Sequence, residues 1–194
     1  MLRIAALTIL ATSLSGCASV YVMSHVPTAT MARLSAMTVA DIDPRELLVV
    51  ARLAKGLEPQ PGGVKVTLGL SAPQGGRRTE TFALEAVPTS AEMVAVAKFQ
   101  RLDEGLFVYQ LSATDMLRLS RIVAETAQAS GSKSISISAG VDACHRGPLT
   151  EGALPSTTIL KANASGYFIL AQDLDIRRLV SASELAAKVP ACVS

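Results

Sequence analysis

Cys144 and His145 are adjacent in the chain and bring together a thiol and one of only two histidines. Such a pair could act as nucleophile and base, help to hold a metal, or supply half of a disulfide. Successive side chains of a strand point to opposite faces, so neighbours at a predicted strand end cannot face each other as a dyad. A metal needs two or three further ligands, and Asp142 is the only candidate nearby. We therefore expect no local dyad and no metal site.

Two other patterns could carry chemistry. Asp173 and Asp175 place two carboxylates on one face of a predicted strand, which could bind a cation but also suits a solvated strand end, the interpretation we favour. Ser130 and Lys133 have the S-x-x-K spacing of penicillin-binding enzymes. Gly131 breaks the turn that would join them, and no K-T-G strand follows. No phosphate-binding or dinucleotide glycine motif occurs, so we expect no cofactor.

The charge and the aromatic content argue against two further kinds of binding site. The formal net charge is +2, with no basic stripe along the chain, so we expect no nucleic-acid partner. The chain has no Trp, and aromatic residues make up only 4% of it, which disfavours sites that stack on sugar rings or bases.

The amino terminus has the features of a secretion signal. Arg3 precedes an apolar run over residues 4–14, which is too short to span a bilayer. The sequence Leu14-Ser15-Gly16-Cys17 resembles the lipobox of bacterial lipoproteins. The resemblance covers residues 1–17 only, and it implies cleavage before Cys17, diacylglycerol on its thiol and acylation of the new amino terminus. Several acyl chains form a stable membrane anchor without a transmembrane helix.

The lipobox divides the chain into three parts. Residues 1–16 are the expected signal peptide, 17–43 the lipidated cysteine and a tether, and 44–194 the folded domain. The tether has no sustained hydrophobic period, contains a short predicted helix near 30–37, and leaves His25 solvated. The resemblance places the domain in the cell envelope, facing the periplasm. Under the sorting rule of enteric lipoproteins, Ala18 and Ser19 in place of Asp favour the outer membrane over the inner.

Export also bears on the remaining cysteines, because disulfides persist in the periplasm. With Cys17 committed to lipid, Cys144 and Cys192 are the only thiols left. No C-x-x-C motif supports redox chemistry at a pair of free thiols. We therefore predict a structural disulfide that fastens the carboxy-terminal tail to the end of the sheet.

From Pro44 onward, short apolar runs alternate with Gly and Pro clusters, which is typical of a mostly β domain. The period of two predicts a hairpin of Val64–Leu70 with Thr79–Val87. A second hairpin, of 93–102 with Leu106–Leu111, is expected around Asp103-Glu104-Gly105, although 91–97 could begin as helix. The other expected strands are Glu46–Leu53, Ser134–Val141, Thr157–Lys161 and Tyr167–Ala171.

One helix is predicted with a clear start and stop. Ser112 and Asp115 resemble a capping box, and Gly131 would end the helix. A last helical turn is expected over 183–188. The fold expected is a two-layer β-sandwich of seven or eight short strands with one interposed α-helix. The residues on the apolar face of the helix are Met116, Leu119, Ile122 and Val123.

Two functions from different classes are compatible with these features. The first is a non-enzymatic envelope lipoprotein that binds or supports another envelope protein through a sheet edge or an apolar groove. The second is a periplasmic hydrolase or ligand-processing enzyme with a site near His145, using Asp142 or Asp173. A pocket that joins His145 to a carboxylate and a hydroxyl would favour the second function. The sequence favours the first.

Overall fold

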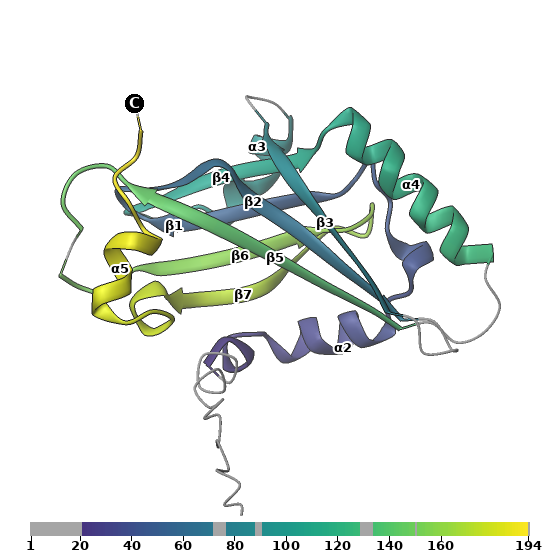
Figure 1. Cartoon of the computed structure of the whole chain (residues 1–194), viewed down its shortest axis with the longest axis horizontal. Coiled ribbons are helices and arrows are strands. Elements are labelled where there is room, and N and C mark those ends of the chain that lie inside the picture. The colour runs from purple at the N-terminus through teal and green to yellow at the C-terminus, as the bar shows by residue number, and fades with distance from the viewer. Residues whose placement is uncertain (1–20, 72–76, 88–90, 129–133, 150, 194) are drawn as a thin grey trace, which may run out of the picture.

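The computed structural model describes residues 21–71, 77–87, 91–128, 134–149 and 151–193. In these ranges seven strands form one antiparallel sheet in the order β5-β2-β3-β4-β1-β6-β7. The sheet is strongly curled, so its two edge strands, β5 and β7, lie on the same side of the molecule (Figure 1). The strands are β1 Leu48–Ala54, β2 Leu57–Ser71, β3 Arg77–Ala86, β4 Glu104–Leu111, β5 Ser134–His145, β6 Pro155–Lys161 and β7 Tyr167–Asp175.

Short helices surround the sheet. A helical turn over residues 21–24 precedes α2, which lies below the two edge strands in Figure 1. The α-helices are α2 Thr28–Ala36, α3 Ala91–Val96, α4 Ala113–Gln128 and α5 Ala182–Lys188. The 3-10 helices are η1 Val39–Asp41, η2 Ala97–Phe99 and η3 Ile176–Arg178.

The main core fills the inside of the curled sheet. Alternate residues of β2 point inward and are buried, as the period of two predicted: Val64, Val66, Leu68 and Leu70. Helix α4 covers this core with Leu119 and Ile122, and its predicted face is confirmed. The predicted hairpin of β2 with β3 is also confirmed, with Lys65 opposite Ala83.

The central strand β1 is buried on both faces, which explains its nearly continuous apolar sequence. Its inner face contributes Val49 to the main core. Its outer face packs Leu48 and Val50 beneath Val96 of α3. Helix α3 and η2 therefore form a second layer outside β4, β1 and β6.

The mostly β class is confirmed, but the layers differ from those expected. In place of the two packed sheets of a sandwich, β3 pairs with both β2 and β4, and Leu84 of β3 lies opposite Leu111 of β4. Alternation tells which side chains point inward but not which strands share hydrogen bonds. A sheet that curls onto itself produces the same alternation as two sheets that face each other.

The strand predicted within 93–102 is wrong, and the alternative of a helix there is correct. This segment forms α3 and η2, and β4 begins only at Glu104. Met93, Val96 and Phe99 are three residues apart, which is a helical spacing, and all three pack against the outer face of the sheet. The expected second hairpin is therefore absent, and β4 pairs with β1 and β3.

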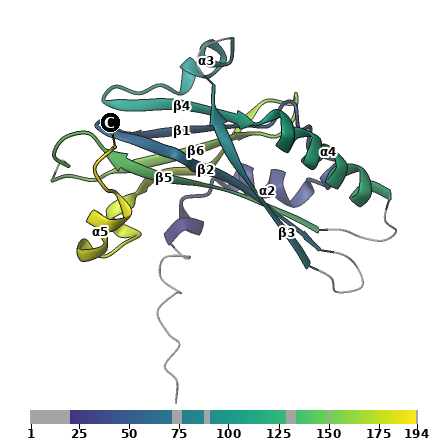
Figure 2. The same ribbon diagram turned by 45° about the horizontal axis from the view of Figure 1, so that its top comes forward.

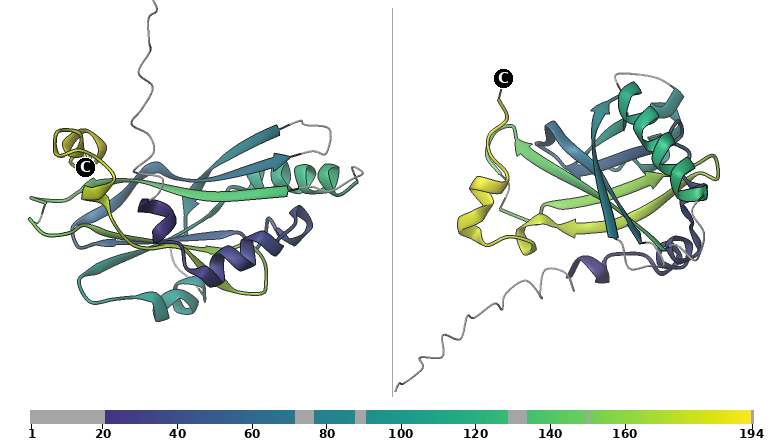
Figure 3. Two further views of the ribbon diagram at one scale, coloured as in Figure 1. Left: turned by 90° about the horizontal axis from the view of Figure 1, so that it is seen from below. Right: turned by 45° about the vertical axis from the view of Figure 1, so that its right-hand side comes forward.

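Residues 21–43, expected to belong to a tether, lie against the folded body (Figure 3). Three hydrogen bonds attach this segment to the edge of β7. The Thr30 hydroxyl donates to the Ile169 carbonyl at 2.6 Å, the Gln172 N–H donates to the His25 carbonyl at 2.9 Å, and the Asp175 N–H donates to the Tyr21 hydroxyl at 3.0 Å. Val39 and Ile42 of the same segment are buried in the main core, and Leu34 and Met37 pack against it. These apolar residues follow no sustained period, so the sequence does not indicate the docking. The predicted short helix is present as α2.

We expect Thr30→Val to loosen this segment. Thr30 is only 3% exposed, and Val keeps its shape while leaving the Ile169 carbonyl without its donor, at a cost of about 1–3 kcal/mol. Amide hydrogen exchange of residues 21–36 should become faster in the variant. Thr28→Val, at an exposed position of the same helix, is the matched control and should exchange as the wild type does. Equal exchange in both variants would show that this hydrogen bond does not hold the segment.

Candidate functional site: the open edge of strand β5

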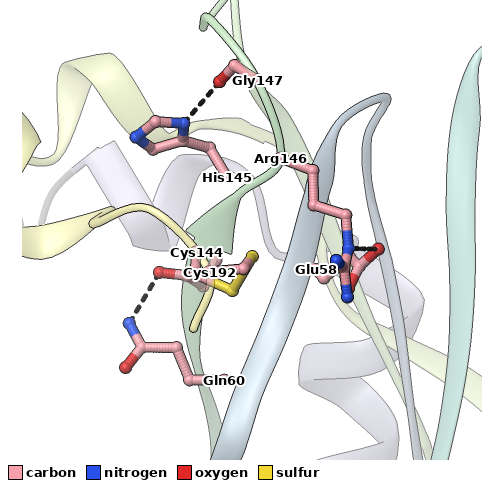
Figure 4. Close-up of a disulfide and its surroundings, with 8 residues drawn as sticks. Glu58, Gln60, Cys144, His145, Arg146, Gly147 and Cys192 are labelled. Carbon is pink, nitrogen blue, oxygen red and sulfur yellow. Dashed lines mark hydrogen bonds and ion pairs between the residues drawn. A yellow bond between two sulfur atoms is a disulfide. The ribbon is translucent and has the colours of Figure 1, made fainter. Parts of the chain in front are cut away.

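The predicted disulfide is present. Cys144, near the end of β5, is joined to Cys192 with their Cα atoms 4.9 Å apart (Figure 4). The backbone beside it also pairs: the His145 N–H donates to the Pro190 carbonyl at 2.9 Å, and the Cys192 N–H donates to the His145 carbonyl at 3.0 Å. The carboxy-terminal segment is therefore fastened along the last residues of β5.

The structure does not assemble a site at His145. Its Nδ1 lies 2.5 Å from the Gly147 carbonyl, which can only accept, so Nδ1 carries the proton. The Asp142 carboxylate pairs instead with the Lys65 ammonium at 3.1 Å. Asp173 belongs to a separate cluster on β7. A hydrolytic centre built from these three residues finds no support in this geometry.

Asp173 lies in a partly buried network of charges around Arg52, a residue of β1 that is 4% exposed. Nη2 of Arg52 donates to Asp173 Oδ1 and to Thr157 Oγ1, each at 2.9 Å. Arg101 donates to the same Asp173 oxygen at 2.8 Å. Nε of Arg52 lies 2.5 Å from Glu104 Oε2, a close ion pair whose atoms are not aligned as a hydrogen bond. This network fixes β1, β4, β6 and β7 relative to one another.

A β-bulge aims Asp173 at this network. Ser156 of β6 pairs with Leu174, but Thr158 pairs with Ala171, so two residues of β7 face the single residue between them. Asp173 has φ 51°, in the left-handed region. Burial raises the pKa of Asp173, but hydrogen bonds and charge from Arg101, Thr157 and Arg52 outweigh it and hold the pKa below its ordinary value.

The two carboxylates considered as cation ligands, Asp173 and Asp175, both have partners within the protein. The Asp173 carboxylate is occupied by two arginines, and that of Asp175 accepts the N–H groups of Leu154 and Arg177 at 3.0 and 3.1 Å. Among the residues that the structure describes, no three His, Cys, Asp or Glu side chains gather as metal ligands.

Strand β5 leaves its outer edge open before its covered carboxyl end. His145 directs both of its backbone polar groups to the carboxy-terminal segment, away from β2. Ala143, Val141 and Ala139 should have the same orientation, because backbone groups alternate along an antiparallel strand. The Ala143 carbonyl is occupied, since the Gln60 amide donates to it at 2.8 Å. Ala139 and Val141 therefore offer N–H and C=O groups at the edge. Within the described ranges, the backbone of residues 138–142 pairs with β2 alone.

A groove of about 250 Å³ lies between the start of this edge and α2. Its lining is mainly apolar, with Leu34, Ser35 and Met37 from the helix side and Ile135, Ser136 and Ile137 from β5. Figure 1 shows α2 and β5 converging toward the same end of the molecule. The other sheet edge, β7, is covered by the amino-terminal segment, whereas the middle of β5 is not covered in the described parts of the chain.

An edge strand beside an apolar groove can take up an extended peptide, whose main chain pairs with the edge while alternate side chains enter the groove. The sequence from Ser134 to Val141 contains no charged residue and no Pro. Charged residues and Pro are the ones that usually prevent another strand from pairing with an exposed edge. Its Ser-Ile-Ser-Ile alternation predicted a strand with one apolar face. Its place at the edge depends on strand order, which the sequence does not indicate.

The remaining sequence predictions fall outside the described residues: Cys17, with the lipobox, and Ser130, Gly131 and Lys133. No helix in the described parts of the chain is long and apolar enough to cross a membrane. No family model matches this chain, and neither the curated proteins nor the solved structures contain a match.

Proposed function

We propose that this protein is a lipid-anchored binding module of the bacterial cell envelope, without catalytic activity. Its β domain faces the periplasm and takes up an extended segment of another envelope protein along the free edge of β5. The acyl chains on Cys17 hold it in the membrane, the outer membrane rather than the inner. The observation that carries the proposal is the open, uncharged edge of β5 beside the α2 groove.

The compartment is supported by two independent features. The lipobox around Cys17 is a signal for export and acylation. The disulfide of Cys144 with Cys192 suits an oxidising compartment. A module fixed to a membrane also gains from restricted diffusion, because anchoring raises the effective concentration of a partner in the same membrane.

The mode of binding follows from the chemistry of the edge. The N–H and C=O groups of Ala139 and Val141 would form main-chain hydrogen bonds with any extended peptide. Selectivity would come from the groove, where Leu34, Met37 and Ile137 favour apolar side chains. We expect the recognised segment to be uncharged and to alternate small polar with branched apolar residues, as β5 itself does.

We expect Cys17→Ser to abolish anchoring. Without the thiol there is no diacylglycerol, so the signal is not cleaved before residue 17 and the acyl chains are lost. Fractionation should find the wild type in the membrane after a high-salt wash, with a Cys17 peptide whose mass includes the acyl chains. Ser15→Ala, which keeps a small residue within the lipobox, is the matched control and should still be anchored. Normal acylation and partition of Cys17→Ser would refute the lipoprotein assignment.

Photo-crosslinking in intact cells tests the binding edge. A benzophenone amino acid at Ser138, on the exposed face of β5, should give discrete crosslinked products with another envelope protein. The same group at Thr79, equally exposed but on the inner strand β3, is the control and should give none. Equal products from both positions would refute recognition at the edge.

Ala139→Pro should reduce the Ser138 crosslink severalfold. Proline removes an N–H that points away from β2, so the β2–β5 ladder keeps its hydrogen bonds while strand addition loses one. Ala139→Gly keeps the backbone N–H at the same position and is the matched control, so its Ser138 crosslink should match that of the wild type. Circular dichroism establishes that each variant is folded. An unchanged yield in folded Ala139→Pro would contradict strand addition.

A further inference from the structure

The docked amino-terminal segment brings the folded body close to the proposed lipid. Tyr21 is already attached, because its hydroxyl accepts the Asp175 N–H at 3.0 Å. Only residues 18–20 separate it from Cys17. Four residue steps span at most about 14 Å in any conformation. A domain of this length has a radius of gyration of about 16 Å. Because the connection is shorter than this radius, one side of the body must lie next to the membrane.

The surface next to that point is unusually poor in charge. Between Tyr21 and Ala40 the only ionisable side chains besides Tyr21 itself are His25 and Arg33, and the Arg33 guanidinium lies 4.5 Å from the centre of the Phe168 ring, turned to the body. The outward face of a surface helix is normally charged. On α2 and the preceding turn it holds small neutral residues and two methionines instead. Met23 is 58% exposed and Met31 40%.

Basic charge lies at the edge of this neutral face, beside Tyr21. The Arg178 side chain is exposed, and its guanidinium carbon lies 5.9 Å from the centre of the Tyr21 ring. The nearest carboxylate in the sequence, that of Asp175, already accepts two backbone N–H groups. Tyrosine and long basic side chains are the residues that favour the headgroup region, where each keeps its polar end in water or on phosphate.

We propose that the face formed by Tyr21, Met23, Met31 and Arg178 lies against the phospholipid headgroups of the anchoring membrane. This inference rests on the proposed lipidation of Cys17. The methionines contact the boundary between headgroups and acyl chains, and Arg178 pairs with lipid phosphate. The body is thereby held in one orientation, with α3 directed away from the bilayer. In Figure 1 α3 lies at the top of the molecule and α2 at the bottom, and in Figure 2 α3 again lies above α2.

Fluorescence quenching on the full-length lipidated protein tests this orientation. With Cys17 acylated and Cys144 in the disulfide, a single introduced cysteine is the only free thiol. A fluorophore is attached to Met31→Cys or to Val94→Cys, each in vesicles of phosphatidylethanolamine and phosphatidylglycerol with nitroxide-labelled headgroups. Val94, on α3, is 78% exposed and serves as the matched control. We expect quenching severalfold stronger at position 31 than at position 94.

Two outcomes overturn the inference, and they are distinguishable. Equal quenching at both positions, or stronger quenching at 94, in protein whose Cys17 peptide carries acyl chains would show that this face is not apposed to the lipid. That result would leave the anchored module intact. A Cys17 peptide without acyl chains would instead remove the proposed anchoring, and with it the basis of the orientation. Mass spectrometry of the same preparation separates the two.

Discussion

Loss of the Cys144–Cys192 disulfide should lower the free energy of unfolding by about 2–5 kcal/mol. The two residues are 48 apart in sequence, and the chain-entropy model assigns a loop of this length about 4 kcal/mol. The carboxy-terminal segment otherwise holds on by two backbone hydrogen bonds to His145 and by α5 packing through Leu185. Without the covalent link, this segment should separate from β5 before the sheet unfolds.

Denaturant unfolding of the detergent-solubilised protein measures this loss. The variant is Cys144→Ala with Cys192→Ala, because a single replacement leaves a reactive thiol. Reductant is the matched control: it should lower the unfolding midpoint of the wild type to that of the double variant and leave the double variant unchanged. A double variant as stable as the oxidised wild type would show that the disulfide does not stabilise the fold.

The same loss has a consequence for the proposed binding edge. Pro190 and Cys192 cover the last outward-facing groups of β5 through His145. Their release would extend the open edge toward its carboxyl end. Because longer exposed edges favour strand addition and also aggregation, the reduced protein should self-associate at lower concentrations than the oxidised protein.

The sequence predicted those parts of the fold that depend on residue type and on spacing along the chain. Alternation placed Val66 and Leu68 in the core, and the capping box at Ser112 marked the start of α4. The count of cysteines paired Cys144 with Cys192. These signals need no knowledge of which elements are neighbours.

The remaining parts depend on partners distant in sequence. The order of strands, which turns β5 into an edge, follows from hydrogen bonds that no residue type specifies. The docking of residues 21–43 depends on backbone groups such as the His25 carbonyl and on apolar side chains such as Ile42, whose partners lie far away in the sequence. The candidate edge could be anticipated as a strand, therefore, but not as an edge.

Arg52 is the clearest example of this limit. Within the apolar run of β1, an arginine suggests a position that faces solvent, yet its side chain is buried. Its side-chain partners come from three other strands: Glu104 in β4, Thr157 in β6 and Asp173 in β7. It also donates to the Phe99 carbonyl of η2. Only the assembled sheet brings these groups together, and the bulge that aims Asp173 has no signature in the sequence.

We expect removal of either partner of the Arg52–Glu104 ion pair to destabilise the protein by about 3–5 kcal/mol. Arg52→Met leaves the Glu104 carboxylate, which is 11% exposed, without its cation. Glu104→Met leaves the guanidinium with only Asp173 as a charged partner. In both cases the destabilisation comes mainly from a charge kept out of water without compensation.

The double variant Arg52→Met, Glu104→Met separates this cause from ordinary loss of packing. With both charges gone, methionines can fill the space, so the double variant should lose much less than the sum of the two single variants. Unfolding in denaturant supplies all four free energies of the cycle. Arg101→Met is the matched control, because Arg101 binds the same Asp173 from a half-exposed position and should cost no more than about 1 kcal/mol. Additive losses in the cycle would show that Arg52 and Glu104 stabilise the sheet independently of each other. The ion pair between them would then not be what holds β1 and β4 together.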